Sequence, residues 1–286
     1  MNISARKARC FVRTGSDAGT SNKTDQYPFC LLGLKNRSRY GILKKGGDLM
    51  DMYVMTDRPD KRTLITTGCY WFVAFFLLPV FLLYLVYGFQ DNDSVLGWVQ
   101  FCYYGTNALC TFFIFREHLA DGWFTLRMEA KKVLLTVAAC AGSFAAVYGL
   151  LMLAGITSLR YAIPVSELEL LLMPEDLVRA NPVFGTLSLT VFTPLTISCL
   201  LYGLGFSPAC NVHPVLGYAV VLAVLGLHRA LNYYTVGTVE LEQMMYAVQL
   251  PAHILACVAY HKTNTVLAPV LFHALINLLS CLWILL

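Results

Sequence analysis

Two pairs of polar side chains interrupt hydrophobic segments near the C-terminus, each a histidine followed four residues later by an asparagine. The pairs are His228 with Asn232 and His273 with Asn277. Residues four apart lie on one face of a helix, one turn apart. Polar groups in hydrocarbon are costly, so such a pair predicts a functional site. The alternative is that each pair only joins neighbouring helices by hydrogen bonds.

A third histidine, His253, lies in the hydrophobic sequence QLPAHILAC. The imidazoles of His228, His253 and His273 could together ligate a divalent metal. The zinc-protease motif H-E-x-x-H is absent, however, and no other ligand motif supports a metal site. No metal ligand is therefore assigned, the cofactor is unknown, and His253 is interpreted as a buried core residue.

These histidines belong to a chain with the composition of a membrane protein. Of the 286 residues, 57% are hydrophobic and 13% are charged, whereas a soluble domain carries about 25% charged residues. The run 63–89 is long enough to cross a hydrocarbon core of about 30 Å. The apolar runs do not alternate as barrel strands do. We therefore predict an all-α, polytopic transmembrane helical bundle of about seven spans, the others at 95–115, 133–156, 184–206, 214–228, 241–260 and 264–286.

The charged residues are distributed unevenly along the chain. Thirteen Lys and Arg precede Leu64, and the segment 116–132, interpreted as a loop, is also basic. The loops 90–94 and 157–183 are acidic. The positive-inside rule places the N-terminus and the basic loop in the cytoplasm and the acidic loops outside. The basic balance thus predicts topology in the membrane, and nucleic acid is not an expected partner because no basic stripe with interleaved aromatic residues is present.

The N-terminal segment has neither apolar periodicity nor the hydrophobic core of a signal peptide. One interpretation is a disordered basic tail. We prefer the hypothesis that 1–49 is not translated, because Lys45-Gly46-Gly47 can be encoded by a sequence resembling a bacterial ribosome-binding site just before Met50 and Met52. Peptides from upstream of Gly46 in the native protein would contradict this hypothesis. We predict the bacterial cytoplasmic membrane as the location.

The C-terminal part, roughly 184–286, resembles the CAAX-protease and bacteriocin-processing (CPBP, or Abi) family, whose enzymes are intramembrane metalloproteases. Members commonly end with a helix, a short turn of the type K/R-T-G/N and a last helix containing H-x-x-x-N. In this chain the turn is KTNT at 262–265, and Pro269 then precedes His273 and Asn277 in the family order.

Two further family motifs lie upstream, and the first departs from the family pattern. The F-x-x-x-H motif has its counterpart at Val224 to His228, with valine in place of phenylalanine. The E-E-x-x-x-R motif aligns with TPLTISCLLYGLGF, where Ile197 and Ser198 take the two glutamate positions and Tyr202 the arginine position. The resemblance implies that a glutamate of this pair activates the hydrolytic water while the histidine and asparagine side chains hold water and oxyanion.

No other carboxylate is expected to replace the missing pair. Glu240 and Glu242 are the nearest acidic pair to the histidine-bearing spans. Because they are two residues apart, they point in different directions on a helix, and the predicted topology places them at the outer surface. Without a carboxylate there is no evident general base of the family type. The resemblance assigns catalytic positions to His228, His273 and Asn277, and a surrounding pocket to Ser198, Tyr202 and Asn232.

Three functions are compatible with this pattern. The preferred one is a catalytically impaired CPBP-like protein that binds a peptide, a lipid or a partner protein. The second is an active intramembrane endopeptidase acting on prenylated or bacteriocin-like peptides, so enzymatic activity stays uncertain. The third is a transporter with a histidine relay. The expected organisation is a basic cytoplasmic tail over 1–62, N-terminal transmembrane helices over 63–183 and the CPBP-like domain over 184–286, with the lipid bilayer as a partner.

Overall fold

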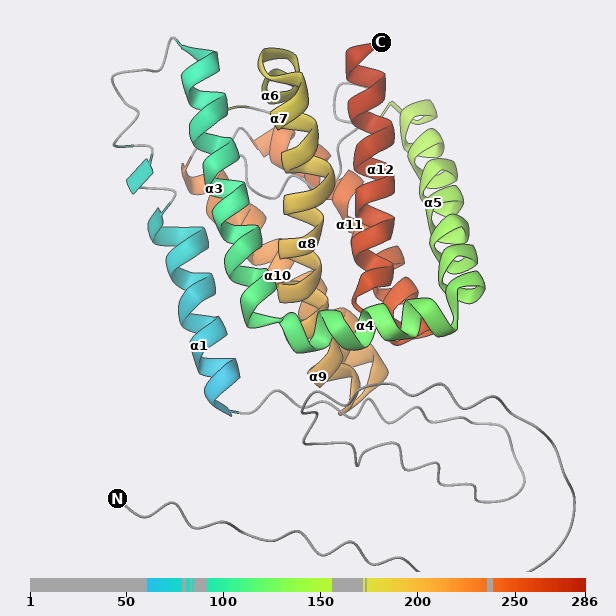
Figure 1. The fold of residues 1–286 in the computed structure, drawn as a ribbon. Coiled ribbons are helices and arrows are strands. Elements are labelled where there is room, and N and C mark those ends of the chain that lie inside the picture. Colours follow the sequence, from blue (N-terminus) through green and yellow to red (C-terminus); the bar gives the residue numbers. More distant parts are fainter. Residues whose placement is uncertain are drawn as a thin grey trace, which may run out of the picture. The chain divides into compact units, whose positions relative to one another are not determined.

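The computed structural model describes residues 61–78, 81–82, 84, 92–155, 172, 174–235 and 239–286, without the side chains of 61–64, 71, 75–76 and 228–248. Every regular element in these ranges is a helix, which confirms the all-helical prediction for the described residues (Figure 1). The elements are α1 (Lys61–Phe72), η1 (Val73–Leu77), α3 (Asp93–Ile114), α4 (Arg116–Met128), α5 (Ala130–Leu153), α6 (Pro174–Ala180), α7 (Pro182–Leu187), η4 (Ser188–Phe192), α8 (Thr193–Ile197), η5 (Ser198–Phe206), α9 (Ser207–Cys210), α10 (Pro214–Thr235), α11 (Val239–Thr263) and α12 (Leu267–Leu285).

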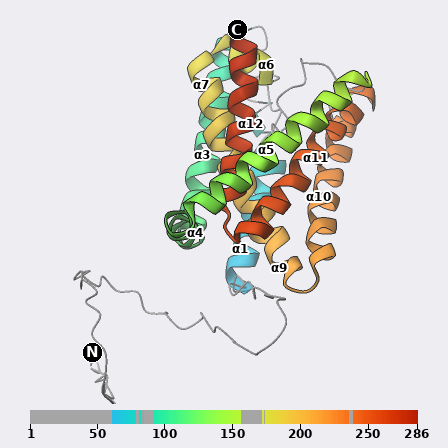
Figure 2. The same cartoon turned by 90° about the vertical axis from the view of Figure 1, so that its right-hand side faces the viewer.

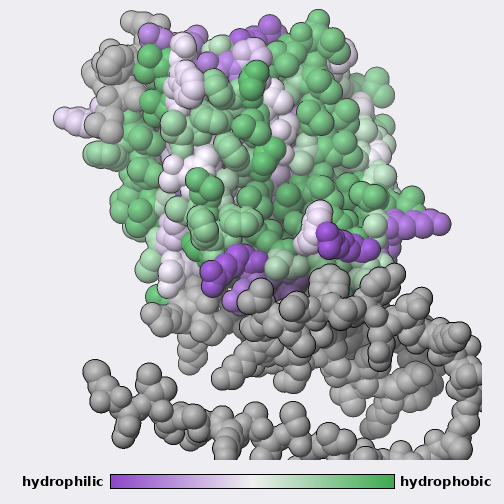
Figure 3. All heavy atoms as spheres, viewed as in Figure 1, coloured by the Kyte–Doolittle hydropathy of each residue, from purple (hydrophilic) through white to green (hydrophobic). Residues whose placement is uncertain are grey.

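Three described helical segments are long and apolar enough to cross a membrane. They are Ala130–Leu153, Pro182–Cys210 and Leu267–Leu285. On α5 and α12 large hydrocarbon side chains such as Leu135 and Leu279 face outward. Figure 3 shows a broad hydrophobic surface on the viewed face, with hydrophilic residues gathered toward the two ends of the helices. An apolar surface of this kind indicates lipid contact, so the chain has the features of a membrane protein.

The structure therefore supports three of the predicted seven spans. α3, α10 and α11 coincide in position with three further predictions. Among the described residues, Pro214–Leu227 of α10 is a shorter apolar helix, and neither α3 nor the described part of α11 is long and apolar enough to be counted as a span. The prediction for 63–89 lies partly outside the described residues, which place α1 and the π-helical η1 at its beginning. The question of translation over 1–49 lies wholly outside them.

The basic segment 116–132, predicted to be a loop, is instead helix α4 and the start of α5. The reason is an amphipathic pattern, in which Leu119 and Gly122 pack inward while the charged residues stay exposed. The acidic segment 157–183 likewise contains α6. Leu172, two residues before α6, is held by Gln100 of α3. The Gln100 side chain accepts from the Leu172 amide at 2.9 Å and donates to the Leu172 carbonyl at 3.3 Å.

The C-terminal helices pack around the interrupted segment Pro182–Cys210. α11 and α12 form an antiparallel pair, and α5 packs against both of them. α10 lies beside α11 and η5, and α3 lies against α8 and η4 (Figures 1 and 2). The central core contains Tyr202, Phe206 and Phe272, which are all fully buried. This packing brings side chains from η5, α11 and α12 to one place.

Candidate functional site

The helical run Pro182–Cys210 is interrupted by π-helical turns where it passes the polar residues. Pro194 has no amide hydrogen, and its ring crowds the carbonyl one turn earlier, so a regular α-helix cannot continue through it. Just before it, the Thr193 amide bonds to the Ser188 carbonyl, five residues back. Such π-turns are rare in proteins as a whole, and those that occur are often found at functional sites. The next π-segment, η5, carries Tyr202.

α11 and α12 carry the two histidines that meet this tyrosine. α11 ends at Thr263, and Asn264 then has φ +52° while its amide donates to the Tyr260 carbonyl at 2.7 Å. Asparagine tolerates this left-handed conformation at a helix end better than most residues. The turn predicted at 262–265 lies at this place, but Lys262 and Thr263 are the last residues of α11, and residues 264–266 connect the two helices. This connection reverses the chain, so that α12 runs back along α11 and His273 lies beside His253.

Tyr202, His253 and His273 form a buried cluster. The Tyr202 hydroxyl lies 2.6 Å from Nδ1 of His253 and 3.5 Å from Nε2 of His273. The two imidazole ring centres are 5.3 Å apart, and all three side chains are 0% exposed. If the hydroxyl donates to His253, its oxygen can accept from His273. The first contact is short and strong, whereas the second is at the limit of a hydrogen bond.

Ser198 lies in the same π-segment as Tyr202, four residues earlier. Its side chain is 0% exposed, and its Oγ has no hydrogen-bond partner among the described residues. Burying a hydroxyl in this way costs about 1–3 kcal/mol on the scale of protein mutational data. Ile197, which aligns with the other glutamate position, packs in the hydrophobic core. One of the two aligned positions is thus polar and buried, and the other is part of the core.

Asn277 is directed to a different partner from His273, although the two share one face of α12. Its Nδ2 donates to the Leu189 carbonyl of η4 at 2.8 Å, and the side chain is fully buried. The bond ties α12 to a π-turn of the interrupted helix. The Asn277 Nδ2 is thus engaged with the backbone, whereas its Oδ1 has no hydrogen-bond partner among the described residues. The expectation that His273 and Asn277 aim at one reacting group stays a prediction.

The described cluster contains no carboxylate and no lysine or arginine. Every buried polar side chain among the described residues carries a hydroxyl, an amide or an imidazole. Within the same part of the chain, no group of three or more His, Cys, Asp or Glu could hold a metal ion. The cluster can exchange hydrogen bonds and protons between phenol and imidazole. Activation of water by a carboxylate is not among its described capabilities.

The other predicted site residues lie outside the described side chains. His228 and Asn232 lie within α10, and Glu240 and Glu242 within α11, but their side chains belong to the range 228–248. The expectation that His228 and His273 face one another thus stays a prediction.

Sequence reasoning missed His253, which was interpreted as a core residue. It is indeed buried, but it makes the shortest contact of the cluster. A signal was present, because Gln249 and His253 repeat the one-turn polar spacing of His273 and Asn277 within an apolar run. Gln249 is also fully buried on α11. A third one-turn polar pair, on the span next to α12, indicates a shared polar interior.

Comparisons with known proteins identify no relative. No family model matches the chain, and neither a curated protein nor a solved structure matches it.

Proposed function

We propose that this chain is an integral membrane protein on a CPBP-like helical plan whose buried cluster binds a membrane-embedded peptide without hydrolysing it. One observation carries the proposal. Tyr202, which takes the arginine position of the E-E-x-x-x-R motif, places its hydroxyl within 3.5 Å of His273, the histidine of the H-x-x-x-N motif. Two positions that the resemblance assigns to one site are therefore neighbours, and His253 joins them.

The chemistry of the cluster favours binding over hydrolysis. A neutral imidazole and a phenol both donate and accept hydrogen bonds, which suits the carbonyl and amide groups of a peptide. Hydrolysis also needs a group that activates water, and the two aligned glutamate positions hold Ile197 and Ser198. A serine without an adjacent base is a weak nucleophile. The active endopeptidase is accordingly the alternative, and it requires a base among Glu240, Glu242 or other side chains outside the described ones.

A peptide can reach the cluster only if the surrounding helices move, because the three side chains are fully buried. α11 contains Pro251, two residues before His253. A proline inside a helix removes one backbone hydrogen bond and is the usual place for a kink. We therefore place the opening at this point of α11, where bending exposes His253 at the smallest cost in broken backbone hydrogen bonds.

A second candidate function is a proton relay for transport. The observation that favours it is the hydroxyl of Tyr202 lying between the two imidazoles, at 2.6 and 3.5 Å. Intramembrane histidines linked to one another by hydrogen-bonding groups are typical of proton pathways. Proteoliposomes that contain a pH-sensitive dye distinguish it, because a relay makes vesicle acidification depend on Tyr202 and peptide binding does not.

The test uses the full chain in lipid nanodiscs with a farnesylated peptide that carries a photoactivatable benzophenone group. After illumination, mass spectrometry of the intact and digested protein measures the adduct and any cleaved peptide. We expect an uncleaved adduct on α10, α11 or α12. Tyr202→Phe and His273→Ala should each reduce its yield about fivefold, corresponding to about 1 kcal/mol for one lost hydrogen bond.

The matched control is Ser280→Ala, which removes a buried hydroxyl from α12 that donates to the Ile276 carbonyl of the same helix at 2.9 Å. It should leave the adduct yield unchanged. Cleaved peptide from the wild type that disappears in His273→Ala would establish the endopeptidase instead. An adduct that neither cluster variant affects would mean that the cluster only joins helices.

A further inference from the structure

Helix α4 joins two upright helices directly. α3 ends at Ile114 and α5 begins at Ala130, so a single residue, Phe115 or Glu129, separates α4 from each neighbour. Figure 1 shows α4 running across the ends of α3 and α12, and Figure 2 shows it near one edge of the described helices. α5 is long and apolar enough to cross a membrane, and α4 is attached to its first turn.

One face of α4 packs tightly against the protein. Leu119 and Gly122 are buried on this face. A Cβ atom at Gly122 would lie 2.8 Å from Oγ1 of Thr265 and 3.1 Å from Cγ of Leu267, at the start of α12. α4 is therefore fixed against the turn between α11 and α12, and its orientation is set by this contact rather than by its short connections alone.

The uncovered part of α4 combines large apolar side chains with a cation. Trp123, Phe124 and Met128 are 53%, 58% and 70% exposed. The Arg127 guanidinium carbon lies 5.4 Å from the centre of the Trp123 ring, within the range of a cation–π contact. Tryptophan is enriched where lipid headgroups meet hydrocarbon, and long basic side chains there extend their charge to the headgroups.

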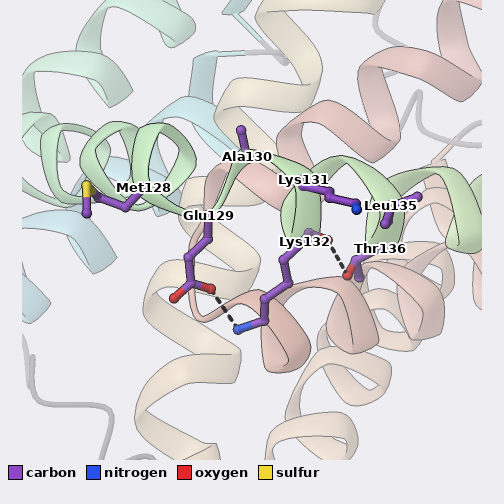
Figure 4. A pocket seen from close by; sticks show the side chains of 7 residues that line it. All are labelled: Met128, Glu129, Ala130, Lys131, Lys132, Leu135 and Thr136. Carbon is purple, nitrogen blue, oxygen red and sulfur yellow. Dashed lines mark hydrogen bonds and ion pairs between the residues drawn. The ribbon is translucent and has the colours of Figure 1, made fainter.

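The junction between α4 and α5 adds further positive charge. A surface depression of about 710 Å³ is lined by residues 128–132, 135 and 136. Figure 4 labels these side chains, which lie where α4 passes into α5. Lys132 pairs with Glu129 at 2.8 Å, whereas Lys131 makes no ion pair among the described residues. With Arg127 in the last turn of α4, residues 127–132 carry three cations and one carboxylate. The exposed side chains of Met128 and Leu135 provide apolar surface beside them.

We propose that α4 lies in the plane of the membrane at headgroup level and that its junction with α5 binds anionic phospholipids. Trp123, Phe124 and Met128 contact the upper acyl chains. Arg127, Lys131 and Lys132 bind the lipid phosphates, with Glu129 limiting the net charge of the site. The proposal is independent of the buried cluster, since it concerns only the position of α4 in the membrane and its contacts with lipid. It also assigns the α4 side to the leaflet with more anionic lipid, in agreement with the positive-inside rule.

The test measures lipid selectivity of the full chain by native mass spectrometry, with phosphatidylglycerol and phosphatidylcholine as probes. We expect the wild type to retain phosphatidylglycerol preferentially. Each cation near an anionic surface contributes about fivefold, so Arg127→Gln with Lys131→Gln and Lys132→Gln should weaken retention on the order of 100-fold. Glu129→Gln, which removes the opposing carboxylate, should strengthen it several-fold. Arg179→Gln, on α6, is the matched control and should have no effect.

A second readout places α4 by depth. Tryptophan fluorescence in nanodiscs with bromine on the lipid chains should be quenched most by bromines near the headgroup, and Trp123→Phe should remove that component. Equal retention of the two lipids by the wild type would overturn the proposal. So would a triple variant with unchanged selectivity, or Glu129→Gln acting in the same direction as the triple variant.

Discussion

Removing the Tyr202 hydroxyl with Tyr202→Phe tests the geometry of the cluster, because the ring stays and only one oxygen is lost. The oxygen lies 2.6 Å from Nδ1 of His253 and 3.5 Å from Nε2 of His273. A buried polar group left without its partner costs about 1–3 kcal/mol. We expect Tyr202→Phe to lower the free energy of unfolding by an amount in this range, with most of the loss arising from the His253 contact.

Double-mutant cycles separate the two contacts. Tyr202→Phe is combined with His253→Ala and, separately, with His273→Ala, so that the cavity left by each alanine cancels. Hydrogen-bond coupling in membrane proteins averages about 0.6 kcal/mol and reaches about 1.7 kcal/mol. We predict a Tyr202–His253 coupling of about 1–1.7 kcal/mol and a Tyr202–His273 coupling below about 0.5 kcal/mol. The assay is unfolding of the full chain in mixed micelles by increasing sodium dodecyl sulfate, followed by circular dichroism.

The control for these cycles is Tyr103→Phe. This hydroxyl also makes a short buried bond, to the Ala74 carbonyl at 2.7 Å, but it joins α3 to η1 away from the cluster. Tyr103→Phe should destabilise the protein without coupling to His253→Ala. Equal couplings of Tyr202 to the two histidines, or a larger one to His273, would refute the inferred hydrogen-bond order.

Three further predictions concern the elements that position the cluster. Asn277→Leu should cost about 0.5–1.7 kcal/mol by removing the bond to the Leu189 carbonyl, and it should leave the Tyr202 couplings unchanged in the same micelle assay. Asn264→Val should lower the stability by about 1–2 kcal/mol because the backbone φ at this position is +52°, whereas Asn264→Gly should be tolerated. Thermal unfolding compares the two variants, and equal melting temperatures would contradict backbone strain at Asn264. Gly122→Ala should destabilise the protein by about 1–3 kcal/mol through overpacking. Gly142→Ala, with no atom within 4 Å of the added Cβ, should stabilise the protein by about 0.5–1 kcal/mol. Chemical unfolding measures both changes, and the opposite order of stabilities would contradict the packing of α4.

Hydrophobic runs and the sequence of the last turn made much of the fold predictable. The apolar run at 133–156 and the K-T-N-T turn predicted α5 and the antiparallel pair of α11 and α12, since length and a residue suited to positive φ determine these features locally. The helix α4 was missed because its apolar residues are interleaved with charges, and that mixture is typical of both loops and interfacial helices. Only the structure shows that Leu119 and Gly122 form the buried face of this helix.

The cluster could be predicted only in part. Tyr202 and His273 came from motif positions, and the structure brings them together. His253 was missed because one histidine in an apolar run has the same pattern whether it is a core residue or a site residue. The hydrogen-bond partner of Asn277 could not be predicted either. Spacing indicates which residues share a helix face, but not which backbone carbonyl lies opposite them. Partner choice depended on where the backbone of η4 lies, which the spacing of residues on α12 does not determine.

The most direct measurement of the proposed function is ¹⁵N NMR of the full chain labelled at histidine in nanodiscs, with and without an unmodified farnesylated peptide. Imidazole nitrogen shifts report the tautomer and the hydrogen bonds of His253 and His273, assigned by the single alanine variants. We predict that the peptide shifts the signals of both residues, that Tyr202→Phe abolishes the change, and that the peptide is recovered intact. Peptide that binds without altering either histidine, or that is recovered cleaved, would contradict a non-hydrolytic binding site at this cluster.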